Sequence, residues 1–364
     1  MKKKRKNLSV LSVVLILAIA TGLFSGCSGT AASSAPATTP ASQATAATSE
    51  TPASTGGALQ KVTLQLKWLP QSQFMGYYLA KSKGYYAAEG LDIEILPGGS
   101  DIIPEQQVSN GVANIGVTWT SSLMKYQGQG WNLQEIAQVF QKSAMLLVSK
   151  KESNISTAAD LKGKKIGSWF GGNEYELYAL LGKQGLDKDK DIQLVQQDFT
   201  MDQLKEGKVD VAQAMTYNEY GLLLEAGYTD KTLNKIDMNE QGTAMLEDCL
   251  FVNTDWLAKN EDVLVRFLKA SIKGWADACA DPEAAGKIVY NENKSVSLEH
   301  QVYMAKEVAK LVVPEGFDKA KIGYMDTAAL KQTADYALKY GLLTKAADLS
   351  QCVSTKYWDK AVAK

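Results

Sequence analysis

The sequence predicts an α/β protein of two lobes, with the second lobe inserted into the first. Two observations support this fold class. Segments in which apolar residues alternate, as in strands, recur between segments with helical spacing, and this succession is typical of mainly parallel sheets covered by helices. A first series of strands and helices ends near Trp119, and a fresh series starts near Ser156. The roughly 300 residues that form these series suffice for two lobes with their own cores.

The first series begins with a strand over 62–68, because Val62, Leu64 and Leu66 fall on one face together with Trp68. A helix is expected over 72–84, where Gly84 is a natural C-terminal stop. Further strands are expected at 91–96 and 112–119, separated by a helical piece at 101–111.

The second series contains strands at 163–172, 191–197 and 209–217, with helices at 173–185 and 200–207. An apolar strand at 245–256 follows, and the chain is then helical, with Asn260 expected to cap a helix over 261–280. These patterns place lobe 1 at 61–148 and 250–364 and lobe 2 at 152–245, so the chain would cross between the lobes twice.

The N-terminal segment has the layout of a secretory signal peptide over residues 1–26, with five basic residues followed by an apolar stretch. Phe24, Ser25, Gly26 and Cys27 resemble the lipobox of bacterial lipoproteins, which implies a lipidated Cys27. The alternatives are an ordinary signal peptide with an incidental cysteine, or an uncleaved anchor. Residues 27–60 are almost entirely Ala, Ser, Thr, Pro and Gly and predict a disordered tether. The folded part would then work at the outer face of a membrane or in the periplasm.

Charge and rare residues exclude several functions. Removal of the five basic residues of the leader takes the formal charge from -1 to -6, and no basic patch remains for nucleic acid. Cys249, Cys279 and Cys352 predict free thiols rather than a disulfide framework, although one disulfide is possible. The chain has one histidine, His300, so neither a histidine-based metal cluster nor a Ser/His/Asp set can be assembled. We therefore expect no catalytic residues, no metal and no cofactor.

Polar and aromatic residues gather where the predicted strands end, which is where open α/β sheets bind ligands. Trp68 follows the first strand, Trp169 ends a strand of the second lobe, and Glu247 lies near the return crossing. The candidate ligand-binding residues are Trp68, Gln73, Tyr78, Thr118, Trp119, Trp169, Gly171, Gly172, Asn173, Glu174, Tyr217, Asn218, Glu219 and Glu247.

This combination favours a neutral or weakly cationic heteroaromatic ligand. Aromatic side chains stack on planar rings, and carboxylates and amides accept hydrogen bonds from ring amines or hydroxyls. An anion site would require arginine clusters, which these strand ends lack. A tryptophan at a strand end also serves packing, and Glu219 and Glu247 could each bind ligand or a structural partner. Tyr77 and Tyr78 point about 100° apart on a helix, so at most one faces the cleft, and we favour Tyr78.

Four blocks carry a resemblance to a known group of proteins. The stretch "LKWLPQSQFMGYYLAKSKGYYAAEGLDIEILPGG" resembles the opening of solute-binding proteins in the thiamine-pyrimidine-synthase-like superfamily of type II periplasmic binding folds. The blocks "IGSWFGGNEYELYALL", "AMTYNEYG" and "AMLEDCLFVNTDWL" resemble later parts of that family, over nearly the whole chain from residue 61 to the mid-330s. The blocks "WFGGNE" and "YNEY" point to the branch that carries heteroaromatic vitamins or their precursors.

The resemblance implies a lipid-anchored substrate-binding protein that works as a monomer with the permease subunits of an ABC importer. Its ligand would be a thiamine pyrimidine precursor such as a formylaminopyrimidine, or alternatively riboflavin, or a taurine, nitrate or sulfonate. Pyrimidine binders of this kind often have W-x-P-N-x-x-H after the first strand. Here Gln71 stands in place of the Asn and the His is missing, which favours riboflavin, or a relative of it, over a pyrimidine precursor as the ligand.

Two rival functions come from other classes. The superfamily includes a thiamine pyrimidine synthase that uses its own active-site histidine and a cysteine-rich motif. His300 lies in the helical C-terminal part and Cys249 stands alone, which argues against that enzyme. A ligand sensor that signals to a membrane receptor has the same expected sequence features as a transport component.

Overall fold

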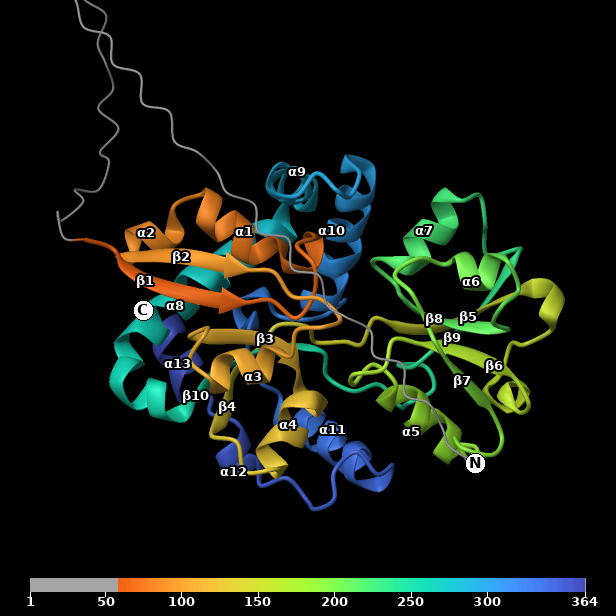
Figure 1. Cartoon of the computed structure of the whole chain (residues 1–364). Helices are drawn as coiled ribbons and strands as arrows, with labels where there is room; N and C mark the ends of the chain where they lie inside the picture. The colour runs from red at the N-terminus through yellow and green to blue at the C-terminus, as the bar shows by residue number, and fades with distance from the viewer. Residues whose placement is uncertain (1–57, 364) are drawn as a thin grey trace, which may run out of the picture. The chain divides into compact units, whose positions relative to one another are not determined.

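The computed structural model of the chain describes residues 58–363, which contain two five-stranded sheets (Figure 1). The first sheet has the strand order β2-β1-β3-β10-β4. Its strands are β1 (Gln60–Gln65), β2 (Leu91–Leu96), β3 (Ile115–Trp119), β4 (Leu133–Gln138) and β10 (Asp248–Asn253). The second sheet has the order β7-β6-β8-β5-β9. Its strands are β5 (Met145–Lys150), β6 (Lys165–Ser168), β7 (Gln193–Gln196), β8 (Val211–Met215) and β9 (Leu233–Asp237).

The predicted α/β fold class with two lobes is confirmed, but both sheets are mixed. In each sheet the first strands pair in parallel, as β1 does with β2 and β3, and β6 with β7 and β8. The strands next to the crossings pair antiparallel: β10 with β3 and β4, and β5 with β8 and β9. The sequence analysis did not predict β4, β5 or β9.

The chain crosses between the sheets at 139–144 and again at 238–247. We call the first sheet with its helices lobe 1 and the second sheet with its helices lobe 2. β5 starts the second sheet at Met145, whereas the predicted first segment of lobe 1 ran to residue 148. β10 starts at Asp248, and the predicted second segment of lobe 1 began at residue 250.

Helices cover the sheets of both lobes. Lobe 2 carries the 3-10 helices η2 (Lys151–Ser153) and η3 (Ala158–Leu161) with α5 (Tyr175–Lys183), α6 (Asp202–Lys205) and α7 (Glu219–Glu225). Lobe 1 carries η1 (Ser72–Phe74), α1 (Met75–Ser82), α2 (Tyr85–Ala88), α3 (Pro104–Ser109), α4 (Thr120–Gly128), α8 (Thr254–Ala280), α9 (Pro282–Glu292), α10 (Leu298–Val312), η4 (Lys319–Lys321), α11 (Thr327–Lys339), α12 (Leu349–Cys352) and α13 (Lys356–Val362).

Two helix starts differ from the sequence expectation. The helix expected over 72–84 is the short η1 followed by α1, and Gly84 with φ 70° separates α1 from α2. Asn260 does not start a helix: α8 begins at Thr254, where the Asn253 side chain accepts from the amides of Asp255 and Trp256. Asn260 instead marks a kink within α8, with φ -135°.

The N-terminal predictions lie mostly outside the described residues. The leader 1–26, Cys27 and the tether up to residue 57 are not described, and β1 begins at Gln60, the last residue of the predicted tether. Between residues 58 and 363, no helix has both the length and the apolar character needed to cross a membrane. Cys249, Cys279 and Cys352 are free, which confirms the prediction for these three thiols.

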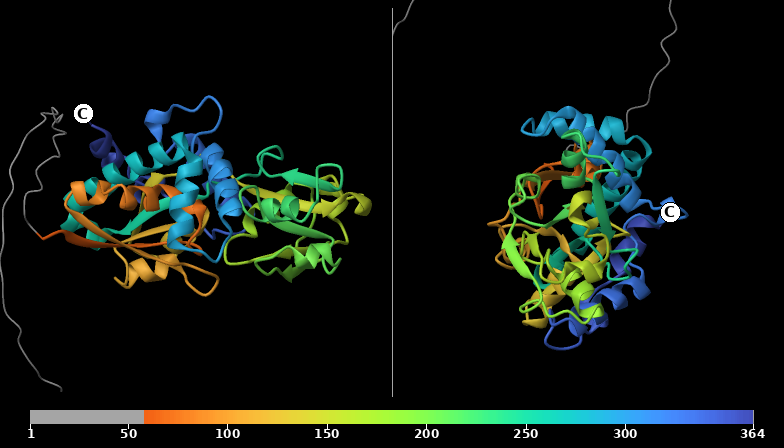
Figure 2. Two further views of the ribbon diagram at one scale, coloured as in Figure 1. Left: turned by 90° about the horizontal axis from the view of Figure 1, so that it is seen from above. Right: turned by 90° about the vertical axis from the view of Figure 1, so that its right-hand side faces the viewer.

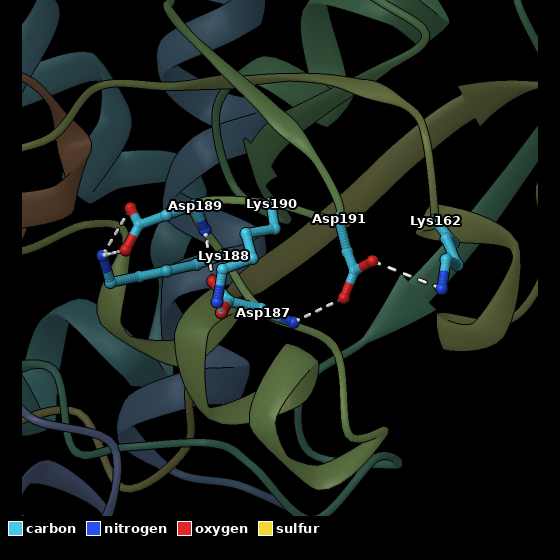
Figure 3. A network of polar contacts seen from close by, with 6 residues as sticks. All are labelled: Lys162, Asp187, Lys188, Asp189, Lys190 and Asp191. Carbon is cyan, nitrogen blue, oxygen red and sulfur yellow. Dashed lines mark hydrogen bonds and ion pairs between the residues drawn. The ribbon is translucent and has the colours of Figure 1, made fainter.

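An ion-pair cluster on the surface of lobe 2 fixes the loop between α5 and β7 (Figure 3). The Asp187 carboxylate pairs with Lys190 at 2.7 Å, and the Asp191 carboxylate pairs with Lys162 at 3.3 Å. The Asp187 amide also donates to the Asp191 carboxylate at 2.8 Å. Exposed pairs of this kind contribute little to stability, so the cluster shapes the loop far more than it stabilises the fold.

The core of lobe 1 depends on a close approach of α1 and α8, which lie side by side over one face of the first sheet (Figure 2). A Cβ atom on Gly76 would lie 2.2 Å from the Trp275 ring, and one on Gly274 would lie 2.3 Å from the Gly76 carbonyl oxygen. The backbones therefore meet at a distance that only glycine permits. This contact fixes the position of α1 relative to α8, and with it the position of the residues that follow β1.

We expect Gly274→Ala to lower the free energy of unfolding by about 1–3 kcal/mol, because the added methyl group forces α1 and α8 apart. Urea unfolding followed by circular dichroism measures the change. Gly128→Ala is the matched control: no atom lies within 4 Å of a Cβ added there, and its stability should stay close to that of the wild type. Equal stability of the two variants would contradict the packing described.

Candidate functional site

A cleft lined by both lobes lies beyond the carboxyl ends of β1, β3, β6 and β8. Its larger cavity has a volume of about 570 Å³, and a smaller one of about 30 Å³ adjoins it and shares Lys67, Trp68, Trp169 and Asn173. The smaller cavity is completed by Gln71, Gln73, Trp119, Met215, Tyr217, Asn218 and Glu219. The larger volume falls in the range of small-molecule sites, about 300–1,000 Å³.

Aromatic side chains from both lobes face this cleft. Trp68 follows β1 in lobe 1, and its ring meets Phe199 of lobe 2 edge-on, with centroids 5.3 Å apart and an interplanar angle of 70°. Trp169 follows β6 in lobe 2, and its indole N–H donates to the Asp198 carbonyl at 2.8 Å. Trp68 and Trp169 are both only partly buried. Each lobe thus offers an indole surface that a flat ligand could cover.

The turn after β6 has unusual backbone geometry. Phe170 has φ 58°, a left-handed conformation that is strained for an aromatic residue, and Gly171 and Gly172 follow with φ 66° and 112°. The Asn173 side chain closes the turn by donating to the Phe170 carbonyl at 2.6 Å. A Cβ on Gly172 would lie 2.4 Å from Ser122 Oγ of lobe 1, so the lobes approach closely at this turn. Strain of this kind concentrates at functional sites.

A buried carboxylate lies under the lobe 1 side of the cleft. Asp248 accepts from Gln73 Nε2 at 2.9 Å and from the Trp119 indole N–H at 3.0 Å. Burial raises the pKa of the Asp248 carboxyl to about 6, while the bonds from Gln73 and the nearby positive charge of Lys67 oppose the rise. Lys67 Nζ lies 4.7 Å from the centre of the Trp119 ring. Asp248 therefore fixes the orientation of Gln73 and Trp119, two of the predicted ligand residues.

Glu219 provides the second buried carboxyl of the cleft. Its Oε2 accepts from the Met215 amide at 3.0 Å and its Oε1 accepts from Asn218 Nδ2 at 2.7 Å. Burial raises the pKa of the Glu219 carboxyl to about 7. Both oxygens have protein partners, so the structural pairing expected for this residue exists, although Glu219 also lines the smaller cavity.

Both crossings between the lobes meet at one hydroxyl, Ser143 Oγ. It lies 2.8 Å from Glu247 Oε1 and 2.9 Å from Glu176 Oε2, and it accepts from the Met145 amide at 3.0 Å. A hydroxyl carries one proton and can donate to only one carboxylate, so one of the two glutamates must be protonated and donate to Ser143. Burial and mutual repulsion raise the pKa of Glu176 well above its ordinary value, and burial raises that of Glu247 to about 8.

The structure brings most of the predicted site residues together. Trp68, Gln73, Trp119, Trp169, Asn173, Tyr217, Asn218 and Glu219 line the smaller cavity, and Thr118 and Gly171 line the larger one. Four others line neither cavity. Gly172 and Glu174 support the turn after β6, Tyr78 is a buried residue of α1, and Glu247 lies at the crossing.

Several residues of the cleft were not predicted from the sequence. Lys67 lines both cavities, although the strand ends seemed almost free of basic residues. Met215 lines the smaller cavity, and Phe199 and the segment 99–105 line the larger one. Lys67 could have been found by its position beside Trp68, but nothing in the sequence marks Phe199, which reaches the cleft from the loop after β7.

The comparisons with known proteins agree with this architecture. Residues 71–285 match the NMT1/THI5-like family. The chain is 27% identical to the "Riboflavin-binding protein RibY" of Chloroflexus aurantiacus over 98% of both chains. It is 23% identical to the "Formylaminopyrimidine-binding protein" of Halalkalibacterium halodurans, over 67% of this chain and 74% of that one. A pyrimidine phosphate synthase of Saccharomyces cerevisiae is 26% identical over 62% of this chain and 69% of that one.

The fold is shared with the periplasmic aliphatic sulphonate-binding protein SsuA from Escherichia coli. The TM-score is 0.64 at 17% identity, over 83% of this chain and 99% of SsuA. The two mixed sheets and the cleft between them define a type II periplasmic binding fold. The chain belongs to the NMT1/THI5-like family of solute-binding proteins, a family that also contains synthases.

The crossing predicts a pH dependence of stability. Folding raises the pKa of Glu247 above that of an ordinary glutamate, so the protonated carboxyl contributes to the free energy of unfolding. This contribution is complete below about pH 4.5 and is lost as the pH rises through about 8. We expect the free energy of unfolding to fall between pH 5 and pH 8.5 by on the order of 2 kcal/mol from this source. The fall should be smaller in Glu247→Gln, which stays neutral, and urea unfolding at both pH values measures it.

Glu152→Gln is the control for this experiment, since the Glu152 side chain is 80% exposed and 3.9 Å from Lys150. It should show the pH dependence of the wild type. If Glu247→Gln also kept the full dependence, the proton of the crossing would not be on Glu247.

Proposed function

We propose that the chain captures riboflavin, or a close heteroaromatic relative, outside the cytoplasm and delivers it to the permease of an ABC importer. The observation that carries the proposal is the pair of partly exposed indoles, Trp68 and Trp169, that the two lobes present to one cleft. Stacking on aromatic rings adds about 0.5–1.5 kcal/mol per pair beyond the burial of apolar area. A planar ring held by both lobes would gain this contribution on each face.

Riboflavin is favoured over the thiamine pyrimidine precursor, which was the first ligand expected from the sequence. The similarity to the riboflavin-binding relative extends over nearly all of both chains, whereas that to the formylaminopyrimidine binder covers about two thirds of this chain. A tricyclic ring also makes fuller use of a cleft of about 570 Å³ than a single pyrimidine ring does. The missing histidine after β1 and Gln71 in place of asparagine point the same way.

A formylaminopyrimidine is the second candidate, supported by the buried carboxyls of Glu219 and Asp248 around the cleft. Carboxylates suit the amino group of an aminopyrimidine. Taurine, nitrate and sulfonates fit less well, because Lys67 is the basic side chain that the two cavities contain within the described part of the chain. The likeness to a sulphonate-binding structure supports the shared fold alone.

Transport requires closure of the lobes and a location outside the cytoplasm. A ligand that touches both lobes favours the closed arrangement by its extra affinity for that state. Lipidation at Cys27 would hold the protein at the membrane, with residues 27–60 as the tether, and it would work as a monomer. Adjacent permease and ATPase genes would support transport, whereas an adjacent histidine-kinase gene would support the sensor alternative.

A binding panel tests the ligand. We expect riboflavin to bind with a Kd of about 1 µM or lower, measured by calorimetry and by quenching of flavin fluorescence, with weaker binding of a formylaminopyrimidine and none of taurine. Protein purified from cells that make riboflavin would be yellow. Tight binding of the pyrimidine alone would replace riboflavin as the ligand, and binding of taurine alone would contradict the heteroaromatic proposal.

Single substitutions test the two indoles. Trp68→Ala and Trp169→Ala should each raise the Kd for riboflavin about tenfold or more, since each removes a stacking surface. Trp256→Ala is the matched control, because Trp256 of α8 is also only partly buried and lines neither cavity. The melting temperatures of all three variants report stability. A loss of stability in Trp169→Ala without a loss of affinity would assign Trp169 to packing.

A further inference from the structure

The single histidine of the chain lies between the lobes, next to the cleft. His300 is on α10 of lobe 1 and is 3% exposed. Its Nδ1 lies 2.8 Å from Glu225 Oε1, and its Nε2 lies 2.9 Å from Asn218 Oδ1. Glu225 ends α7 of lobe 2, and Asn218 directly precedes α7 and lines the smaller cavity. One imidazole ring thus joins lobe 1 to two residues of lobe 2.

The pattern of hydrogen bonds assigns the protons of this ring. A carboxylate accepts only, so Nδ1 must donate to Glu225. Asn218 uses its amide nitrogen to donate to Glu219 Oε1 at 2.7 Å, which turns its oxygen toward His300. When Glu219 is ionised, Nε2 must then donate as well. Both ring nitrogens carry protons in this arrangement, and His300 is an imidazolium that faces one carboxylate and one amide oxygen.

The contact between α10 and α7 is closely fitted around this ring. Tyr303, one turn further along α10, stacks on His300 with centroids 6.0 Å apart and an interplanar angle of 24°. Its hydroxyl donates to the Thr216 carbonyl of lobe 2 at 2.9 Å. A Cβ on Gly221 would lie 2.3 Å from the Tyr303 ring, so α7 approaches α10 as far as a glycine allows.

Charged groups surround His300 on both lobes. On α7, Glu225 contacts the ring and Glu219 lies one hydrogen bond beyond Asn218, with Tyr220 as the remaining titratable side chain. On α10, Glu299 adds a negative charge, whereas the positive end of the helix opposes the imidazolium. Ser72 of η1 contacts Gln301, and α8 meets α10 in the apolar cluster that contains Met304 and Val308. Gly286 of α9 packs on Val302, and Glu283 of α9 interacts with Lys306 of α10.

We propose that His300 is a positioning residue that holds Asn218 toward the ligand and, as an imidazolium, ties α7 of lobe 2 to α10 of lobe 1. This inference rests on the proposed function, because it assigns the retention of the captured ligand to this link. Asn218 cannot turn its oxygen away from His300 without losing that bond. The link thereby couples the side chain in the cleft to the arrangement of the two lobes.

The first experiment needs no ligand. In protein labelled with ¹⁵N-histidine, the two ring nitrogens of the single His300 give the only imidazole signals of the chain. We expect both nitrogens to be protonated near neutral pH in the wild type, and less so in Glu225→Gln, which lacks the carboxylate. A singly protonated ring in the wild type near neutral pH would overturn the assignment, whatever the ligand of the protein is.

The second experiment measures riboflavin dissociation by stopped-flow recovery of flavin fluorescence. We expect His300→Ala to raise the dissociation rate about tenfold or more, since it removes a hydrogen bond to a charged group. His300→Gln, which keeps a donor for Asn218, should recover part of the loss.

Glu283→Gln is the matched control, because Glu283 forms an exposed ion pair with Lys287 at 2.7 Å on α9, away from the ring. It should leave the dissociation rate unchanged, whereas Glu225→Gln should raise it. Melting temperatures separate retention from folding. Unchanged dissociation in folded His300→Ala or in folded Glu225→Gln would overturn the proposal. If the wild type does not bind riboflavin at all, the proposed ligand fails, and the ring-proton measurement still decides the state of the link.

Discussion

The arrangement of the cleft depends on one buried hydroxyl at the place where the chain crosses between its lobes. Ser143 lies on the first crossing and contacts Glu247 on the second and Glu176 on α5 of lobe 2. Glu247 also accepts from the Ala144 amide at 2.8 Å, and Glu176 accepts from the Met245 amide at 2.8 Å. Because these bonds tie both crossings to one helix, the two segments must move together. A hinge so constrained can open and close the cleft while each sheet stays intact.

The chemistry of the cleft follows from what this hinge brings together. Each lobe contributes an indole at a strand end, and each places a buried carboxyl behind polar side chains: Asp248 behind Gln73 and Trp119, and Glu219 behind Asn218. These carboxyls accept hydrogen bonds from protein donors. They therefore orient the side chains that line the cleft rather than offer free charges to a ligand. What remains for a ligand is flat apolar surface with a few amides and Lys67. That balance is the physical basis for favouring an uncharged heteroaromatic ring.

The sequence predicted the two-lobed fold because strand and helix periods alternate clearly, and it predicted Trp68, Trp169 and Asn218 because strand ends mark ligand sites. It did not reveal β4, β5 or β9, although Gly128, Gly130 and Asn132 mark a turn directly before β4. Glu247 looked like a ligand residue because a carboxylate in apolar surroundings needs a partner, but only the fold shows that Ser143 is that partner. Phe199 and the role of His300 depend on contacts between distant segments, which no local pattern encodes.

We propose that a planar ring binds between the indoles of the two lobes, and a crystal structure of the protein with riboflavin would show this contact. We expect the isoalloxazine ring in the cleft, in contact with Trp68 from lobe 1 and Trp169 from lobe 2, with Asn218 held by His300 beside it. A flavin bound elsewhere, or one that touches a single lobe and leaves either indole uncovered, would rule out this mode of binding.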